Sequence, residues 1–469
     1  MVVFIEAEIN MIHLYNSLTK KKTQLTPLVE GKLGLYVCGL TVYDQAHIGH
    51  LRCMLVFDFL VRFLRSMHID VTYVRNITDV DDKIIKRAQE EGISTEQLTQ
   101  RVIEGIVAQE RKLGLVEPTH EPRASQYITQ MVEMIQVLVD KGFAYVARTG
   151  DVCFSVAKYA DYGQLSGQSI EALIQGHRIE GEGKQSQTDF VLWKQSKPGE
   201  PYWPSPWGDG RPGWHIECSA MSDDLLGKTF DLHGGGIDLK FPHHENERAQ
   251  SVCATGGECA KHWMHVGHLH VNDEKMSKSL GNFITIEDAL SKYHPELLKL
   301  FLLKTHYRQP FNYTESGVKE VQTILLNFYL AVWPYARSEV DESQESWQLF
   351  KSALADDLNI AKALSVMHQV SNQLLEKATE DLASQAAVLY AMGDVLGIIQ
   401  EDPTVFLQGG VDVDAISEQV SQRQKARLEK DYSAADAIRD QLQVKGVVVE
   451  DRRDGSRWYY QYAGLRVST

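Results

Sequence analysis

The chain has 469 residues, 43% hydrophobic and 24% charged, with a formal net charge of −15. These values are typical of a water-soluble protein of about three domains. No segment is long and apolar enough to span a membrane, and the acidic balance argues against indiscriminate nucleic-acid binding, although local patches can still recognise an RNA.

The N-terminus lacks the basic segment that opens a secretory signal and carries Glu6 and Glu8 instead. Because Met11 offers an alternative start, residues 1–10 are expected to be a dispensable N-terminal extension. The six cysteines form no CxxC pair and are sparse for this length. We therefore expect reduced thiols in a cytoplasmic protein rather than a disulfide framework.

The first informative region joins a strand to a helix. Leu33 to Val37 predicts a short buried strand, and from Leu51 apolar residues recur four apart, as in a buried helix. Residues 47–50, His-Ile-Gly-His, lie at this junction. Helix N-termini bind anions, and two histidines can donate hydrogen bonds to a triphosphate while Gly49 permits close approach. In isolation the motif is equally typical of two histidines capping a loop.

Residues 117–205 interrupt this predicted nucleotide-binding fold. The interruption opens at Glu117-Pro118 and closes in a segment dense in proline, glycine and tryptophan. Its apolar spacing predicts a helix over 128–138, followed by strands between 144 and 156. It is therefore interpreted as an insertion.

A second set of side chains has the chemistry of metal ligands. Residues 231–239 predict a strand, a glycine-rich turn and the approach to a helix. In that helix His243 and Glu247 lie four residues apart on one face, the spacing of paired metal ligands, while His244 is expected to point elsewhere. Alone, such a pair is more often a surface hydrogen bond.

A tetrahedral zinc needs two more ligands, and two cysteines are candidates. Cys218 precedes an apolar stretch, and Cys38 follows the strand that ends at Val37, nine residues before His47. Ligand sites of parallel sheets collect at the carboxyl ends of strands, so Cys38 is expected beside the triphosphate site. Spacing alone leaves open whether the four residues form one site.

The second polar motif is Lys-Met-Ser-Lys-Ser at 275–279. It follows a predicted strand over 262–271 and a turn, and precedes a helix that begins near Thr285. Lys275 and Lys278 can neutralise the charge that builds on the phosphates as pyrophosphate leaves. In isolation a solvated loop is the more common interpretation; its occurrence with the first motif favours ATP binding.

The remainder is mostly helical. Amphipathic segments from Glu296 to about Ile399 predict a helical bundle. Residues 401–410 are interpreted as a linker, 416–446 as helical and 447–462 as strand-like. Between Arg423 and Arg457, nine Lys/Arg face seven Asp/Glu, so this region is only mildly basic.

Together these motifs resemble the cysteinyl-tRNA synthetases, which are class I aminoacyl-tRNA synthetases. The resemblance runs from about Met11 to at least Trp458, and its most specific stretches are residues 36–44, 75–84, 213–221 and 241–247. It implies an α/β protein with a Rossmann-like parallel-sheet catalytic domain. The expected boundaries are 11–116 and 206–295 for the catalytic halves, 117–205 for the connective insertion, 296–400 for the bundle, and 401–469 for a small mixed α/β anticodon-binding domain.

The resemblance also implies roles for individual residues. One Zn²⁺ is expected on Cys38, Cys218, His243 and Glu247. ATP with Mg²⁺ is expected on His47, Gly49, His50, Lys275 and Lys278, of which all but the glycine are the expected catalytic residues. The cysteine pocket is expected to include Gly39, Thr41, Thr78, Trp214 and His233. Anticodon contacts are expected from Arg427, Asp436 and Asp451, since aspartates can accept hydrogen bonds from base amino groups.

The implied activity is ATP-dependent ligation of L-cysteine to the 3′ end of tRNA(Cys) through a cysteinyl adenylate. Zinc is expected to select the thiolate over serine, and the protein is expected to be a cytoplasmic monomer that binds no membrane. Three alternatives remain: a ligase joining cysteine to an amino sugar, a catalytically silent tRNA-binding protein, and a zinc hydrolase. The C-terminal region counts against the first and the intact ATP motifs against the second, while nothing supplies a catalytic base for the third.

Overall fold

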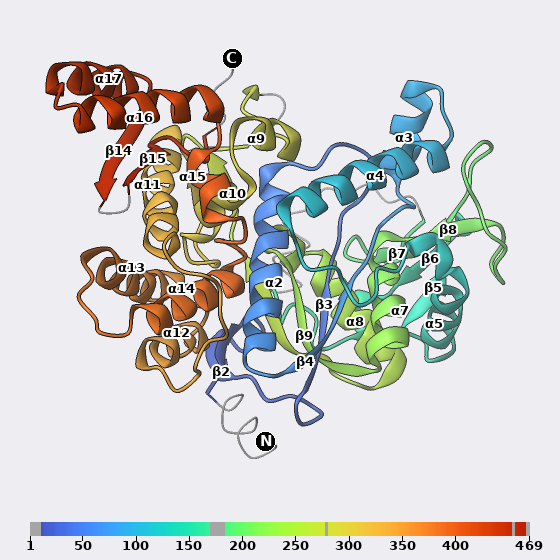
Figure 1. The fold of residues 1–469 in the computed structure, drawn as a ribbon. Helices are drawn as coiled ribbons and strands as arrows, with labels where there is room; N and C mark the ends of the chain where they lie inside the picture. The colour runs from blue at the N-terminus through green and yellow to red at the C-terminus, as the bar shows by residue number, and fades with distance from the viewer. Residues whose placement is uncertain (1–10, 169–182, 277–279, 453–454, 466–469) are drawn as a thin grey trace.

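The computed structural model describes residues 11–168, 183–276, 280–452 and 455–465. The predicted extension at 1–10 and the predicted ATP ligand Lys278 lie outside these ranges. At the centre is a four-stranded parallel sheet in the order β10-β9-β3-β4 (Figure 1). Its strands are β3 (Lys32–Val37), β4 (Asp70–Arg75), β9 (Thr229–Gly236) and β10 (Cys259–Val266).

Both faces of this sheet are buried, as expected for parallel strands. Leu33 and Leu35 of β3 belong to the core that contains the helix α2 (Ile48–Ser66). Tyr36, on the opposite face, belongs to a second core with the helices α7 (Trp214–Leu226) and α8 (His243–Thr255). The predicted strand and buried helix are thus confirmed, although α2 begins three residues earlier than predicted because His47 caps its first turn.

The segment between β4 and α7 adds further helices and a second sheet. It contains the helices α3 (Asp82–Glu91), α4 (Thr95–Leu113) and α5 (Ile128–Asp140), and the short helices η1 (Ala124–Gln126) and η2 (Val156–Lys158). An antiparallel sheet in the order β5-β6-β7-β8 follows: β5 (Ala144–Val146), β6 (Val152–Phe154), β7 (Phe190–Gln195) and β8 (Gly210–Pro212). The predicted helix over 128–138 is confirmed, and β8 places the end of this sheet beyond residue 205.

The predicted strand over 262–271 is two strands. β10 ends at Val266 and β11 (Leu269–Val271) joins another sheet, with β12 (Glu274–Lys275) and β13 (Phe311–Tyr313). The break has a physical cause, because the buried Arg52 guanidinium of α2 binds the carbonyls of Gly267 and His268 at 2.8 and 3.1 Å. The Gly267 and His268 carbonyls thus bind the Arg52 side chain at the point where the chain passes from β10 to β11. The remaining early elements are the hairpin β1 (His13–Asn16) with β2 (Lys21–Gln24), and η3 (Ile237–Lys240) after β9.

The C-terminal part is helical, as predicted (Figure 1). Its helices are α9 (Ile286–Lys292), α10 (Pro295–Leu303), α11 (Glu315–Val332), α12 (Glu345–Ala355), α13 (Ile360–Glu376) and α14 (Leu382–Leu396). The predicted linker over 401–410 is wrong in part, since it contains the helix α15 (Pro403–Gln408). Asp402 caps this helix and its Phe406 ring stacks on Tyr329 at 3.9 Å, so burial fixes a segment that turn residues alone would leave irregular.

The last unit has its own small core. The predicted helical segment 416–446 is two helices, α16 (Val413–Leu428) and α17 (Tyr432–Val444), and the predicted strands form the hairpin β14 (Val447–Arg452) with β15 (Gly455–Tyr460). Ile416, Leu442 and Trp458 pack together there. In the described part of the chain no helix combines the length and hydropathy needed to cross a membrane.

Candidate functional site

A cavity of about 460 Å³ opens at the carboxyl ends of the parallel strands. Cys38 and Gly39 line it after β3, Asn76 after β4, Asp238 after β9 and His268 after β10. Ligands of open α/β sheets bind at this edge because the strands there give way to loops and helix N-termini. The tertiary structure thus brings residues from four distant segments to one wall.

A glycine is needed at position 39 because the backbone of Asn76 lies very close to it, not because the chain turns there. Its N–H donates to the Asn76 Oδ1 at 2.9 Å, and a Cβ built at this position would lie 1.6 Å from the Asn76 carbonyl oxygen. Any side chain there would push apart the ends of β3 and β4. The backbone of the cavity wall is therefore fixed by Gly39 and Asn76.

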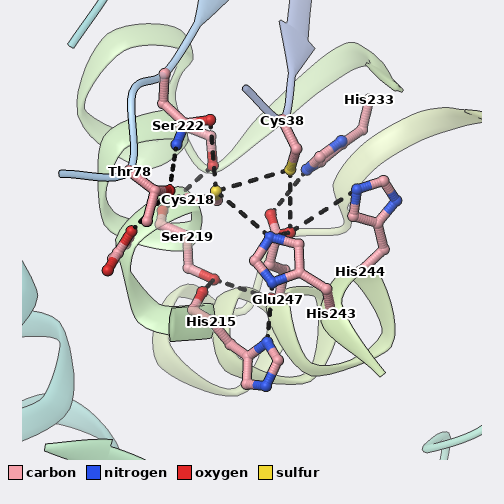
Figure 2. Close-up of polar contacts among 12 residues, drawn as sticks. Cys38, Thr78, His215, Cys218, Ser219, Ser222, His233, His243, His244 and Glu247 are labelled. Atoms are coloured by element: carbon pink, nitrogen blue, oxygen red, sulfur yellow. Dashed lines mark hydrogen bonds and ion pairs between the residues drawn. The ribbon is translucent and has the colours of Figure 1, made fainter. Parts of the chain in front are cut away.

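The four predicted metal ligands meet at this edge of the sheet (Figure 2). The Cys38 Sγ lies 3.7 Å from the Cys218 Sγ and 3.4 Å from the Glu247 Oε1. The Cys218 Sγ is 3.6 Å from the His243 Nε2, which is 2.8 Å from the Glu247 Oε1. All four side chains are buried.

Two of these separations fit a tetrahedral zinc. Two thiolates each ~2.3 Å from one ion would lie roughly 3.8 Å apart, and a thiolate and an imidazole roughly 3.5 Å apart. The observed sulfur–sulfur and sulfur–nitrogen distances of 3.7 and 3.6 Å are close to both. Two thiols, one imidazole and one carboxylate are also ligand types that zinc accepts.

The four groups shift one another's protonation. Although burial opposes ionisation, the hydrogen bonds from Cys38 and His243 lower the pKa of Cys218 to about 6. Burial and the neighbouring Cys218 raise the pKa of Cys38 well above its ordinary value. Against the cost of burial, Glu247 and Cys218 raise the pKa of His243 to about 10, and His243 and His233 hold the pKa of Glu247 well below its usual range. Cys38 and His243 are therefore protonated in the empty cluster, and a divalent cation that binds there would displace these protons.

The expectation that His244 points elsewhere is wrong. Cys38, His233, His244 and Glu247 form a second group that could hold a metal ion. The His233 Nε2 lies 2.8 Å from the Glu247 Oε2, whereas the His244 Nε2 lies 4.0 Å from Oε1 and has no hydrogen-bond partner in the described structure. His244 and Glu247 are three residues apart, so they share one side of α8, a spacing that the expectation from His243 and Glu247 left out.

Around the cluster, other histidines orient the ligands. The His215 Nδ1 lies 2.9 Å from the His243 Nδ1 (Figure 2). The His244 Nδ1 lies 2.9 Å from the His265 Nε2. Partners on the far side of a metal-binding imidazole fix its orientation. The sequence analysis assigned no role to His215, Glu217 and His265. The repeated histidines near Cys218 and Glu247 are the feature of the sequence that could have indicated them.

The His-Ile-Gly-His motif forms the first turn of α2. The His47 Nδ1 accepts hydrogen bonds from the N–H groups of Gly49 and His50, at 3.1 and 3.3 Å. A Cβ on Gly49 would lie 2.9 Å from the His47 ring, so glycine leaves room for this cap. Burial, with His47 and Lys83 nearby, lowers the pKa of His50 to about 3. His50 is therefore neutral at physiological pH.

The two polar motifs touch through their flanking backbone. The N–H of Ile48 donates to the carbonyl of Ile284 at 3.1 Å, and that of Ile286 donates to the carbonyl of Ala46 at 2.9 Å. The predicted helix start near Thr285 is confirmed, and Thr285 and Asp288 form a capping box there. Lys275 is exposed and lines the same cavity as His47. The segment after the second motif is thus tied directly to the start of α2.

The five predicted cysteine-pocket residues lie in two layers. Gly39, Thr41 and Trp214 line the cavity. Thr78 and His233 are buried among the residues behind its wall, where the Thr78 hydroxyl donates to the Glu217 Oε2 at 3.1 Å. The Trp214 ring stacks on His243 with centroids 4.3 Å apart, so it covers one of the candidate ligands.

The three predicted anticodon residues lie in the C-terminal unit. Asp451 accepts two hydrogen bonds from Arg423, at 2.7 and 3.0 Å, and pairs with Arg427. These hydrogen bonds hold the pKa of the Asp451 carboxyl well below its ordinary value. Asp436 is exposed on α17. Two of the three predicted contacts are thus paired with each other on one surface.

Comparisons with known proteins cover nearly the whole chain. The family described as tRNA synthetases class I (C) catalytic domain matches residues 24–323, the DALR domain family matches 349–400, and the cysteinyl-tRNA ligase anticodon binding domain family matches 414–458. A cysteine–tRNA ligase of Legionella pneumophila (strain Paris) is 49% identical, and one of Alkalilimnicola ehrlichii is 48% identical. Each comparison covers 96% of this chain and 99% of the relative.

Solved structures show the same fold at low identity. A methionyl-tRNA synthetase of Mycobacterium tuberculosis, in complex with methionyl-adenylate, superposes with a TM-score of 0.55 at 15% identity, over 78% of this chain and 89% of that one. At that identity the likeness shows the fold alone. The catalytic-domain match and the near-full-length relatives together place the chain in the cysteine–tRNA ligase family of class I tRNA synthetases.

Proposed function

We propose that the chain catalyses the ATP-dependent ligation of L-cysteine to the 3′ end of its tRNA, through a cysteinyl adenylate. One observation carries the proposal: Cys38, a member of the candidate metal cluster, lines the same cavity as His47 and Lys275. The two ATP motifs and the candidate metal cluster would therefore contact the same bound substrate. The full-length relatives named cysteine–tRNA ligase support the same reaction.

The cavity residues supply charge and position. In the first step the cysteine carboxylate attacks the α-phosphate of ATP, forming the adenylate and releasing pyrophosphate. The N-terminus of α2, with His47 and His50 as neutral hydrogen-bond donors, holds the triphosphate, while Lys275 and Lys278 neutralise the leaving pyrophosphate. In the second step the terminal ribose hydroxyl of the tRNA attacks the adenylate carbonyl, releasing AMP. Both steps rest mainly on positioning and charge stabilisation, so no general base is assigned.

Selection against serine is the reason to place zinc on Cys38, Cys218, His243 and Glu247. Shape alone separates near-isosteric substrates by only about 1–3 kcal/mol. Zinc held there would bind the substrate sulfur as a thiolate and would be a poor partner for a hydroxyl. Trp214 packs against His243 at the cavity wall, where it would hold the substrate toward the cluster.

For the rest of the chain we propose the division given by the predicted boundaries. Residues 401–469 would bind the anticodon, through Arg427, Asp436 and Asp451, and 117–205 would be the connective insertion. In this proposal the protein is a cytoplasmic monomer whose catalytic domain and anticodon-binding domain bind the same tRNA. The matched anticodon-binding family over 414–458 supports this assignment.

The decisive experiment is cysteine-dependent exchange between ATP and labelled pyrophosphate. We expect exchange with cysteine, none with serine, and loss of exchange after zinc is removed with a chelator, restored by adding zinc back. Exchange that is equal with serine would refute the selection by zinc. No exchange with either amino acid would refute the adenylate chemistry.

A further inference from the structure

A second cavity, of about 920 Å³, lies outside the candidate catalytic site. It is bordered by α4, α9 and α10, with Arg62 of α2 and the segment at Gln400 completing it, and no residue lines both cavities. Figure 1 shows α4 running toward α2, and this helix walls both spaces. Its Ile106 and Glu110 face the catalytic cavity, while Gln109 and Lys112 face the second.

Lys299 is a largely buried residue that lines this cavity. The residue is only 3% exposed, and within the described ranges its ammonium makes no hydrogen bond or ion pair. Burial lowers the pKa of Lys299 to about 8, although Glu296 and Asp58 oppose that shift. A largely buried charge without a direct partner is costly to a protein, and an anion bound in the cavity would offset that cost.

The two carboxylates that act on the charge of Lys299, those of Glu296 and Asp58, accept hydrogen bonds from other groups. Glu296 accepts from the Tyr329 hydroxyl and the Ile399 N–H, both at 2.7 Å, and from the N–H of Gln400 at 2.9 Å. Asp58 accepts from the Arg62 Nε at 2.9 Å and from the N–H of Val116 at 2.6 Å. Neither carboxylate binds the Lys299 ammonium directly, so its donors stay open toward the cavity.

Two glycines keep the space beside the ammonium open. Gly114 and Gly397 end α4 and α14 in the left-handed conformation, at φ of 60° and 66°. A Cβ on either would lie 3.9 and 3.2 Å from the Lys299 Nζ. At the rim, Arg111 and Lys112 are exposed on the last turn of α4.

The lining of the second cavity has a small excess of positive side chains. Arg62 pairs with Asp58 and His294 pairs with Glu401. Glu296 keeps its negative charge, although it accepts hydrogen bonds from Tyr329 and from the N–H groups of residues 399–401. The described lining holds four positive side chains, Arg62, Arg111, Lys112 and Lys299, against the three carboxylates Glu287, Glu296 and Glu401.

We propose that this cavity binds a phosphate group, with Lys299 as the buried donor and Arg111 and Lys112 at the entrance. Lysine binds phosphate as a point charge with three donors. The phosphate could come from the backbone of a bound RNA or from a small free phosphate. Either would rest on α4, the helix that also walls the catalytic cavity.

The test compares Lys299→Met with Lys292→Met in the full-length, zinc-loaded chain. Lys292 is exposed at the end of α9, outside the cavity, so its variant removes the same charge. Two probes separate the two phosphate sources. Binding of inorganic phosphate is measured by the shift of the thermal unfolding midpoint. Binding of a tRNA(Cys) transcript is measured by filter binding. We expect Lys299→Met to weaken binding of one probe about tenfold, the loss expected for one charged hydrogen bond, and Lys292→Met to leave it unchanged.

Stability separates this role from a structural one. Because Lys299→Met removes an unpaired buried charge, its unfolding midpoint without ligand should equal or exceed that of the parent. A loss confined to inorganic phosphate identifies a free anion, and a loss confined to the transcript identifies an RNA phosphate. Unchanged binding of both probes, or a lowered midpoint without ligand, overturns the proposal. Both readouts measure binding, so failure of the exchange assay leaves them interpretable.

Discussion

His47 and His50 hold each other through a reciprocal cap. The N–H of His50 donates to the His47 Nδ1 at 3.3 Å, the N–H of His47 donates to the His50 Nδ1 at 3.4 Å, and the two rings stack with centroids 3.5 Å apart. Since a backbone N–H only donates, each Nδ1 must be the acceptor and each neutral ring carries its proton on Nε2. Folding of α2 therefore sets the tautomer that a triphosphate would meet.

A substitution at His47 can separate its structural role, capping α2, from its proposed role in binding phosphate. Asparagine is a good N-cap but offers no donor where the imidazole Nε2 lies, so His47→Asn should change the free energy of unfolding by less than about 0.5 kcal/mol. Pyrophosphate exchange should fall about 10²- to 10³-fold, the loss typical of one donor to a developing charge. Urea unfolding and exchange kinetics measure the two effects. Full exchange activity in this variant would rule out phosphate contact by His47.

The ligand assignment is tested by contrasting two substitutions. Cys218→Ser should remove bound zinc and cysteine affinity and leave ATP binding nearly intact, because Cys218 belongs to the group whose separations match tetrahedral zinc. His244→Gln, which alters the alternative group, should keep one zinc per chain. Metal content by mass spectrometry and cysteine binding by calorimetry give the answer. The reverse result would move the metal to the group with His233 and His244.

Arg52 should be the most costly single loss in the catalytic core. Its guanidinium, in a residue 1% exposed, binds the carbonyls of Gly267, His268, His306 and Gln309. Arg52→Met leaves the carbonyls of Gly267 and Gln309 without this donor, whereas those of His268 and His306 keep a backbone N–H donor. We expect a loss of about 3–5 kcal/mol in the free energy of unfolding. Arg65→Met, at an exposed position near the end of the same helix, is the control and should cost less than about 0.5 kcal/mol. Equal effects of the two in urea unfolding would contradict the role of Arg52.

The ion pair between Asp451 and Arg423 gives a pH dependence with a defined sign. The folded state lowers the pKa of Asp451, so the pair stabilises the C-terminal unit above the unfolded value of 3.8. That contribution is lost as the pH falls through the folded pKa. Asp451→Asn should therefore lower stability at pH 7, by about 1 kcal/mol because the carboxylate is partly exposed, and the difference from the parent should shrink below pH 3.8.

Scanning calorimetry at pH 7 and pH 3 measures that difference. Asp436→Asn is the matched control, since it removes an exposed aspartate from the neighbouring helix α17. A deficit of the Asp451 variant that grows on acidification would show that the ion pair does not stabilise this unit.

Local physical chemistry made much of the fold predictable. The strand at Leu33 to Val37, the buried helix after it and the capping box at Thr285 follow from apolar spacing and side-chain caps within a few residues. The helix α15 did not follow, because Phe406 packs on Tyr329 of a distant helix. The break at Gly267 was hidden for the same reason, since its cause is Arg52.

The sequence by itself determined the two polar motifs, the helical spacing of His243 and Glu247, and the family resemblance that joined them. Only the tertiary structure decided that Cys38 and Cys218, 180 residues apart, lie within 3.7 Å of each other, and that His244 turns toward the same cluster. The physical reason is the parallel sheet, whose crossovers carry distant strand ends to one edge. Lys299 belongs to the same category: its place in an amphipathic helix predicts nothing of a buried, unpaired ammonium, which arises where α2, α4 and α10 meet.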